Sequence, residues 1–223
     1  RFLAAVERRA QGEPLAYVTG WTGFRRLTLT TDRRALIPRP ETEGLVELVL
    51  AHQGDGVVAD ICTGTGCVAL ALADEGRYES VHAVELDPEA HALAQENIRA
   101  TGLRVRLHRG DLVVPISGLV LDALVSNPPY VTEAECDALD PSVRAWEPRL
   151  ALASGRDGLQ HTRRLLDEGR GVLRAGGLVA LELDASRAAA SAEIAKEMGW
   201  TDIAVHRDLY GRERYLTARR SKE

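Results

Sequence analysis

The chain has 223 residues, a length that suits one α/β domain or such a domain with a small appendage. Its formal net charge of −5 argues against a protein that grips a nucleic-acid backbone, because such proteins are usually basic on at least one face. The sequence has no apolar run of membrane-spanning length and no signal-peptide pattern, so we expect a cytoplasmic protein without membrane contact. The cysteines are odd in number and lack metal-ligand spacing, so we interpret them as reduced thiols and expect no metal: Cys62, Cys67 and Cys136.

The first part of the chain is expected to hold a helix, a break and a hairpin. Phe2, Leu3 and Val6 fall on one helical stripe, and the chain enters in mid-helix, so we expect further residues upstream. Turn residues and an alternating pattern mark the segments after this helix. In chain order we predict a helix over residues 1–10, a break at 12–14, a β-hairpin over 24–37 that turns at 30–32, proline punctuation at 38–40 and a helix over 42–51.

The remaining residues alternate short apolar runs with helical patterns. We predict strands over 57–61, 81–85, 104–108, 121–126 and 178–183, after a Gly176-Gly177 turn, with 201–206 and 214–218 as a final pair. The intervening helices are expected over residues 66–75, 88–101, 160–173 and 185–198. This order predicts a Rossmann-like α/β fold with a mostly parallel seven-stranded sheet, helices on both faces and a final antiparallel strand. In such sheets the ligand site lies beyond the carboxyl ends of the strands.

A glycine-containing loop follows the first of these strands and opens a helix. It reads Asp60-Ile-Cys62-Thr63-Gly64-Thr65-Gly66. The glycines allow close backbone approach to a ligand, and the helix start offers free N–H groups. Asp60 would repel a pyrophosphate but suits a ligand with an ammonium group, and S-adenosylmethionine has both an ammonium and a carboxylate. The alternative is a purely structural turn between strand and helix.

Acidic residues also follow the next two strands. Glu85 lies about twenty residues past the glycines, where a carboxylate can accept both hydroxyls of a ribose; a solvated strand end is the alternative. Asp87 is expected to cap the helix that begins at residue 88. Asp111 could accept an adenine amino group and Leu112 could cover the ring, although a helix cap at Asp111 is an equal alternative.

The fourth strand is followed by Asn127-Pro128-Pro129-Tyr130. The asparagine oxygen and a proline carbonyl both accept hydrogen bonds, and prolines donate none, so the loop presents acceptors in a fixed geometry. Two such acceptors fit one NH2 group. They would hold a weakly nucleophilic amide or exocyclic amine in line with a methyl sulfonium, while Tyr130 gives an apolar or cation–π wall. A plain Pro-Pro turn is the alternative, and the three upstream matches disfavour it.

These two loops together resemble those of methyltransferases that act on planar nitrogen. Five further stretches resemble one branch, the release factor glutamine N5-methyltransferases: EPLAYVTGWTGF (13–24), LIPRPETE (36–43), EPRLAL (147–152), GRDGL (155–159) and RDLYGRERY (207–215). The similarity covers essentially the whole chain. It departs from the family at Cys62, where glycine is commoner, and before residue 13, where the family carries a helical domain that helps grip the release factor.

The resemblance implies methylation of the glutamine in the Gly-Gly-Gln loop of class I bacterial release factors. S-adenosylmethionine would be the donor and S-adenosylhomocysteine the product. The cofactor residues would be Asp60, Cys62, Thr63, Gly64, Thr65, Gly66, Glu85, Asp111, Leu112 and Asn127. The substrate residues would be Phe24, Arg39, Asn127, Pro128, Pro129 and Tyr130, of which Asn127, Pro128 and Tyr130 would be catalytic.

The resemblance also divides the chain into three parts. Residues 1–12 would end the helical substrate-binding domain, 13–40 would be a linker and hairpin, and 41–223 the methyltransferase domain. We expect a monomer. No strong general base is present in the acceptor loop, and none is required, because a protonated N-methyl amide is acidic enough to lose its proton to water.

Three rival functions fit parts of the same sequence. An adenine amino-methyltransferase acting on DNA or RNA would need the same acceptor loop, but the chain is acidic and has no inserted target-recognition domain. A non-catalytic binding module on a Rossmann scaffold would have no use for Asn127. A nicotinamide dehydrogenase is weaker still, since nothing supplies a proton relay.

Overall fold

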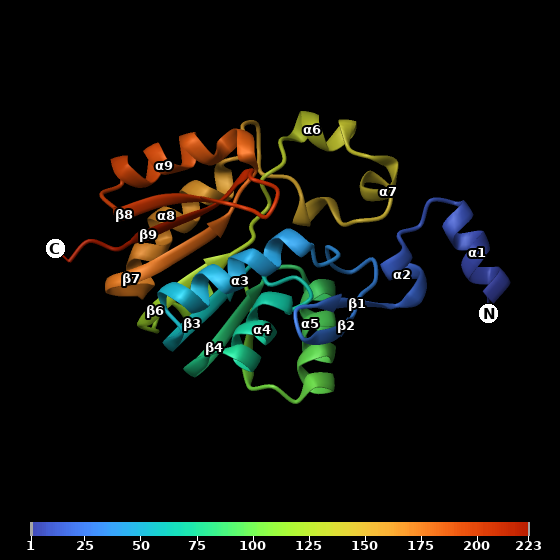
Figure 1. The fold of residues 1–223 in the computed structure, drawn as a ribbon, viewed down its shortest axis with the longest axis horizontal. Coiled ribbons are helices and arrows are strands. Elements are labelled where there is room, and N and C mark those ends of the chain that lie inside the picture. The colour runs from blue at the N-terminus through green and yellow to red at the C-terminus, as the bar shows by residue number, and fades with distance from the viewer. Residues whose placement is uncertain (1, 223) are drawn as a thin grey trace.

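The computed structural model describes residues 2–222, so residue 1 of the predicted first helix lies outside the described residues. The strands are β1 (Trp21–Phe24), β2 (Leu27–Thr30), β3 (Asp55–Ile61), β4 (Arg77–Glu85), β5 (Val105–Arg109), β6 (Leu121–Ser126), β7 (Leu173–Glu182), β8 (Thr201–Arg207) and β9 (Glu213–Arg219). The α-helices are α1 (Phe2–Ala10), α2 (Leu15–Thr19), α3 (Pro40–His52), α4 (Cys67–Glu75), α5 (Pro88–Thr101), α6 (Glu133–Ala138), α7 (Pro141–Arg144), α8 (Gln160–Val172) and α9 (Ala188–Glu197). Figure 1 shows how they are arranged around one large sheet.

Seven strands form that sheet in the order β5-β4-β3-β6-β7-β9-β8. All neighbouring pairs are parallel except those of β9, which runs antiparallel to both β7 and β8. The separate pair β1-β2 precedes them. The predicted fold class is therefore confirmed. After β3 the chain builds outward through β4 and β5, then returns to add β6 on the other side, so the carboxyl ends of β3 and β6 flank the point where the strand order reverses.

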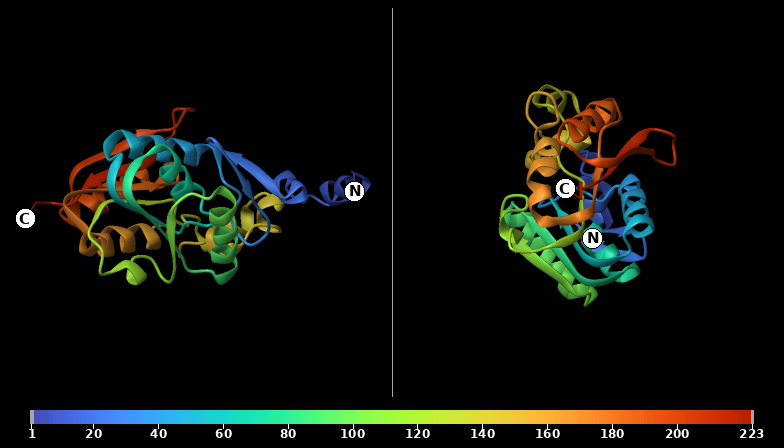
Figure 2. Two further views of the ribbon diagram at one scale, coloured as in Figure 1. Left: turned by 90° about the horizontal axis from the view of Figure 1, so that it is seen from below. Right: turned by 90° about the vertical axis from the view of Figure 1, so that its left-hand side faces the viewer.

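Both faces of the sheet are covered, as expected of parallel strands with apolar runs. On one face, α3, α4 and the end of α5 pack on alternate strand residues such as Val58 and Ala123. On the other face, α8 and α9 pack on the intervening residues, such as Ala59 and Leu124. Figure 2 shows the two helical layers on either side of the sheet.

The main errors in the sequence-based boundaries lie in two places, although β4 also begins at Arg77 rather than at residue 81 and α9 at Ala188 rather than at residue 185. The hairpin turns at Arg25-Arg26, not at residues 30–32, and Arg25 has the positive φ of 49° that a tight turn requires. The Gly176-Gly177 pair lies inside β7 rather than before it, at an irregularity in the pairing with β6. Glycines in a strand often mark such a bulge. The short helices α2, α6 and α7 were not predicted.

One side chain of α5 links the hairpin to the loop after β3. The Asn97 side chain on α5 accepts a hydrogen bond from the Thr30 amide of the hairpin and donates to the carbonyl oxygens of Thr30 and of Thr65, in the loop after β3.

All three cysteines are free thiols. Within residues 2–222, none of the helices has both the length and the apolar character that crossing a membrane would require.

Candidate active site

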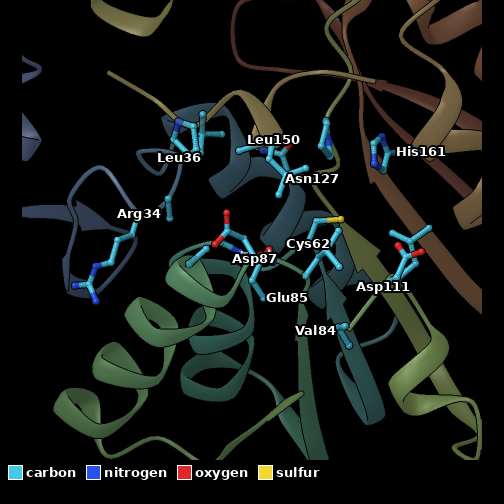
Figure 3. A pocket seen from close by; sticks show the side chains of 18 of the residues that line it. Arg34, Leu36, Cys62, Val84, Glu85, Asp87, Asp111, Asn127, Leu150 and His161 are labelled. Carbon is cyan, nitrogen blue, oxygen red and sulfur yellow. Dashed lines mark hydrogen bonds between the residues drawn. The ribbon is translucent and has the colours of Figure 1, made fainter. Parts of the chain in front are cut away.

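Two adjoining cavities open at the carboxyl ends of the central strands. The first encloses about 720 Å³ with its open mouth included, and Figure 3 shows its wall. The second encloses about 390 Å³ and lies toward the start of α3. Leu36, Cys62, Gly64 and Asn127 line both cavities, so the two form one continuous site.

The Asp60 side chain holds the loop after β3 by two hydrogen bonds. Its Oδ2 accepts hydrogen bonds from Thr63 Oγ1 at 2.5 Å and from the Ala69 amide at 3.1 Å. The side chain is 1% exposed, and burial raises its pKa to about 7. Asp60, Thr63 and Thr65 line the second cavity. The loop therefore presents a buried, readily protonated carboxyl group and two hydroxyls to that cavity.

Glu85, at the end of β4, joins two loops. Its Oε2 accepts from the Gly64 amide and its Oε1 from the Asp87 amide, both at 2.9 Å. It is nearly buried, and desolvation raises its pKa. These contacts exclude the solvated strand end that we considered. Asp87 caps α5 as predicted, by accepting from the Glu89 amide at 2.7 Å, and it also lines the first cavity.

Positive φ angles shape the cavity wall at two non-glycine residues. Cys62 has a φ of 62° and Leu112 a φ of 42°. Few side chains accept this left-handed conformation. It turns the backbone at Cys62 sharply between β3 and the glycines, and it turns Leu112, 4% exposed, onto the first cavity. Gly66, also left-handed, precedes α4 and lines neither cavity.

Asp111 lies on the first cavity but does not cap a helix with its side chain. Its carboxylate accepts from Arg164 on α8, at 2.8 and 3.2 Å. His161, one turn earlier on α8, lines the same wall, where Figure 3 places it beside Asp111. Sequence reasoning missed His161 and Arg164. It also missed the apolar cover from Leu150, which belongs to the segment after α7. The one sequence signal for His161 is its place at the start of a predicted helix, near the sheet edge where the site lies.

Asn127 stands where the two cavities meet. Its Nδ2 donates to Thr42 Oγ1 at 3.1 Å, and among residues 2–222 no hydrogen bond uses its Oδ1. Pro129 lines the first cavity, whereas Pro128 is buried and lines neither cavity. Arg39 lines the second cavity and is paired with the buried Glu147 at 2.6 Å.

The remaining two predicted residues do not line the cavities. Phe24 is 1% exposed and packs in the core beneath α3 and α4 rather than on a cavity wall. Tyr130 is half-buried beside Glu182, Arg214 and Arg39, and burial raises its pKa to about 12. Within residues 2–222, no group of three His, Cys, Asp or Glu side chains gathers as a metal site.

Known proteins resemble this chain along its whole length. A family model described as the methyltransferase small domain matches residues 41–141. The release factor glutamine methyltransferase of Moorella thermoacetica is 43% identical over 229 residues, which cover 100% of this chain and 81% of that protein. The chain belongs to the release factor glutamine methyltransferase family. A second member, from Deinococcus radiodurans, is 42% identical over 97% of this chain and 78% of its own length.

Solved structures show the methyltransferase fold of this family member. A methyltransferase from Pyrococcus furiosus superposes with a TM-score of 0.66 at 22% identity, over 86% of this chain and 88% of that one. The hMettl16 catalytic domain, solved in complex with a MAT2A 3'UTR hairpin, gives a TM-score of 0.71 at 18% identity, over 94% and 81%. The family resemblance inferred from the sequence is confirmed, and methyltransferases of this fold use S-adenosylmethionine.

Proposed function

We propose that this protein transfers a methyl group from S-adenosylmethionine to the side-chain amide nitrogen of the glutamine in the Gly-Gly-Gln loop of bacterial class I release factors. The observation that carries the proposal is Asn127, whose amide nitrogen is held by Thr42 while its oxygen is left to accept. It lies at the junction of two cavities in a chain 43% identical to a release factor glutamine methyltransferase. The protein would act as a monomer in the cytoplasm.

The residues of the two cavities fit the cofactor. In the first cavity, each Glu85 oxygen accepts one amide hydrogen and retains a lone pair for a ribose hydroxyl. Apolar residues offer surfaces for a purine ring, with Asp111 at the edge to accept from its amino group: Leu36, Leu86, Ala90, Leu112 and Leu150.

The second cavity fits the amino-acid end of the same cofactor. Thr65 Oγ1 is buried and, within residues 2–222, has no hydrogen-bond partner. A buried hydroxyl with so little hydrogen bonding favours a polar ligand at this position. Asp60 adds a carboxyl group that attracts an ammonium once it is ionised. The bound cofactor supplies an electrophilic methyl group on a sulfonium.

Catalysis by this chain would consist of alignment and exclusion of water. Asn127 Oδ1 and the Pro128 carbonyl would accept the two hydrogens of the glutamine amide and fix its nitrogen in line for attack. Pro128 and Pro129 contribute no competing N–H donors. Such alignment can supply about 7–11 kcal/mol in favourable cases. Arg39 would line the second cavity, near the amino-acid end of the cofactor. Tyr130 would support the acceptor loop from outside the cavities.

The proposal is tested by methyl transfer from labelled S-adenosylmethionine. The substrates, offered side by side, are a bacterial class I release factor, its variant with Gln→Ala in the Gly-Gly-Gln loop, and duplex DNA. Label on the intact release factor alone supports the proposal. Label on DNA would move the activity to the adenine-methyltransferase alternative, which the comparisons do not favour.

The role of Asn127 is tested in the same assay. Asn127→Ala is expected to lose most turnover, at least about a hundredfold, because one of two acceptors that align the nucleophile is gone. Cofactor affinity, measured by calorimetry, should fall only modestly, since the Glu85 and Asp60 contacts remain. A near-normal turnover number in this variant would remove Asn127 from the proposed mechanism.

A further inference from the structure

A buried carboxylate lies behind the proposed acceptor loop. Glu182 ends β7, is 1% exposed and lies close enough to the Thr42 hydroxyl for that hydroxyl to lower its pKa. Its Oε2 has no hydrogen-bond partner within residues 2–222. Thr42, in the first turn of α3, is also 1% exposed, and it accepts from Asn127 Nδ2 at 3.1 Å. Asn127, Thr42 and Glu182 therefore form a chain of neighbouring side chains, in which Asn127 donates to Thr42 and Thr42 adjoins Glu182.

The chemistry of the three groups gives this chain one direction. An ionised carboxylate only accepts, so the single Thr42 hydroxyl hydrogen must point to Glu182. The oxygen of Thr42 can then only accept from its other neighbour, which requires the NH2 end of the Asn127 amide. That leaves Asn127 Oδ1 on the opposite side, toward the cavities. Because Thr42 and Glu182 are buried, the reverse arrangement would be costly, since it would place the acceptor Asn127 Oδ1 against the acceptor oxygen of Thr42.

We propose that Thr42 and Glu182 are positioning residues that fix the orientation of the Asn127 amide and so present its oxygen, not its nitrogen, to the glutamine NH2. The inference rests on the proposed function, because only an NH2 nucleophile needs an acceptor there. It assigns a role to the start of α3 and to the end of β7, both of which lie outside the acceptor loop. Neither residue touches the reacting atoms.

Protonation of Glu182 would reverse the chain. A neutral carboxyl group can donate to Thr42, whose hydrogen then turns to Asn127 and favours the flipped amide. Burial raises the pKa of Glu182 to about 7, while Thr42 and the nearby cations oppose the rise. The charged and titratable groups around it are Arg39 and Glu41 at the start of α3, Cys67 on α4, Tyr130 after β6, and Arg214 and Tyr215 on β9. Turnover should therefore be full above pH 7 and fall as pH drops below it.

The first experiment compares Thr42→Val with Thr42→Ser on a bacterial class I release factor. Valine matches threonine in shape but cannot link Asn127 to Glu182, so kcat is expected to fall about tenfold, the effect of one lost hydrogen bond. KM for the release factor should change little. Serine keeps the hydroxyl and should retain near-normal kcat. Equal kcat in both variants and the unmodified protein would overturn the inference and leave the proposed function standing.

The second experiment uses the pH profile of kcat, with both substrates saturating so that Asp60 of the cofactor-free protein does not contribute. The unmodified protein should show an acid limb near pH 7, and Glu182→Gln should lose that limb whatever rate remains, because the glutamine does not titrate. A limb that persists unchanged in Glu182→Gln would overturn the role of Glu182. If the unmodified protein binds cofactor but labels no release factor, the proposed function fails, and the inference fails with it.

Discussion

Cys62 carries a conformational cost at the centre of the site. Its φ of 62° lies in the left-handed region, which costs an L-residue roughly 1–2 kcal/mol and is most costly for β-branched side chains. The residue cannot relax, because β3 ends just before it and Thr63 is anchored to Asp60 and to the Val84 carbonyl just after it. The small, unbranched cysteine side chain is compatible with this position.

Substitutions at Cys62 should therefore separate backbone strain from chemistry. Cys62→Val is expected to lower the free energy of unfolding by about 2 kcal/mol or more, while Cys62→Gly should stay within about 1 kcal/mol, since relief of strain offsets the entropy of glycine. Urea unfolding measures both. Cys67→Val, at a position with ordinary helical φ, is the matched control and should cost less than Cys62→Val. Equal losses at the two positions would show that strain is not the cause.

At this scale the sequence predicts which residues gather, but not all that they do. Asp60, Glu85 and Asn127 lie at or directly after strand ends, and the parallel sheet necessarily brings such positions to one edge. Their burial, and hence the raised pKa values of Asp60 and Glu85, depends on neighbours distant in the chain. His161 was missed because nothing local marks a helical residue whose partner is a cavity. Phe24 was misplaced because an aromatic residue in a motif and one in a core look alike.

At the scale of elements, α3 matters most for the site because it carries Thr42 and packs closely against β9. The Tyr215 hydroxyl, from β9, donates to the Glu41 carbonyl at 2.6 Å and lies directly against Gly44. A Cβ on Gly44 would collide with that hydroxyl and lie 3.0 Å from Tyr215 Cζ. The glycine is needed for this close approach of helix and strand.

Gly44→Ala is expected to push α3 away from β9 and lower the free energy of unfolding by about 2 kcal/mol, from overpacking and a weakened hydrogen bond. Because Thr42 would move with the helix, kcat on the release factor should fall too. Gly171→Ala in α8 is the control: its Cβ would meet nothing within 4 Å, and alanine favours a helix, so it should be neutral or stabilising. Thermal unfolding of the pair decides, and an unaffected Gly44→Ala would contradict this packing.

The predicted elements differ in how well local pattern could define them. The helix over residues 88–101 and the strand over 121–126 match their observed bounds, because proline and glycine mark one and a buried apolar run marks the other. Helix α6 went unpredicted although Thr132 and Glu135 form a capping box, because six residues are too few to show a period. The hairpin turn was misplaced because Arg25 adopts a positive φ without being a typical turn residue.

At the scale of the whole molecule, α1 stands apart from the rest. None of its residues is buried, and Phe2, Leu3 and Val6 are 79%, 75% and 48% exposed. Figures 1 and 2 show it projecting at one end, far from the large sheet. Its attachment runs through Arg8, which pairs with Glu13 and donates to the Tyr17 carbonyl at 3.1 Å. We propose the division into residues 1–12 for release factor binding, 13–40 as linker and hairpin, and 41–223 for catalysis.

Removal of residues 1–10 tests this division. The deletion discards few buried contacts, so the thermal midpoint should fall by less than about 4 °C, the shift that 1 kcal/mol produces in a domain of this size. Cofactor affinity and kcat should be unchanged, because the cavities lie on other elements, whereas KM for the release factor should rise. The triple variant Phe2→Ser, Leu3→Ser, Val6→Ser keeps Arg8 and its partners while removing the apolar stripe. If the stripe contacts the release factor, this variant should raise KM as the deletion does. A deletion that lowers kcat or cofactor affinity instead would show that the first ten residues serve the methyltransferase domain itself.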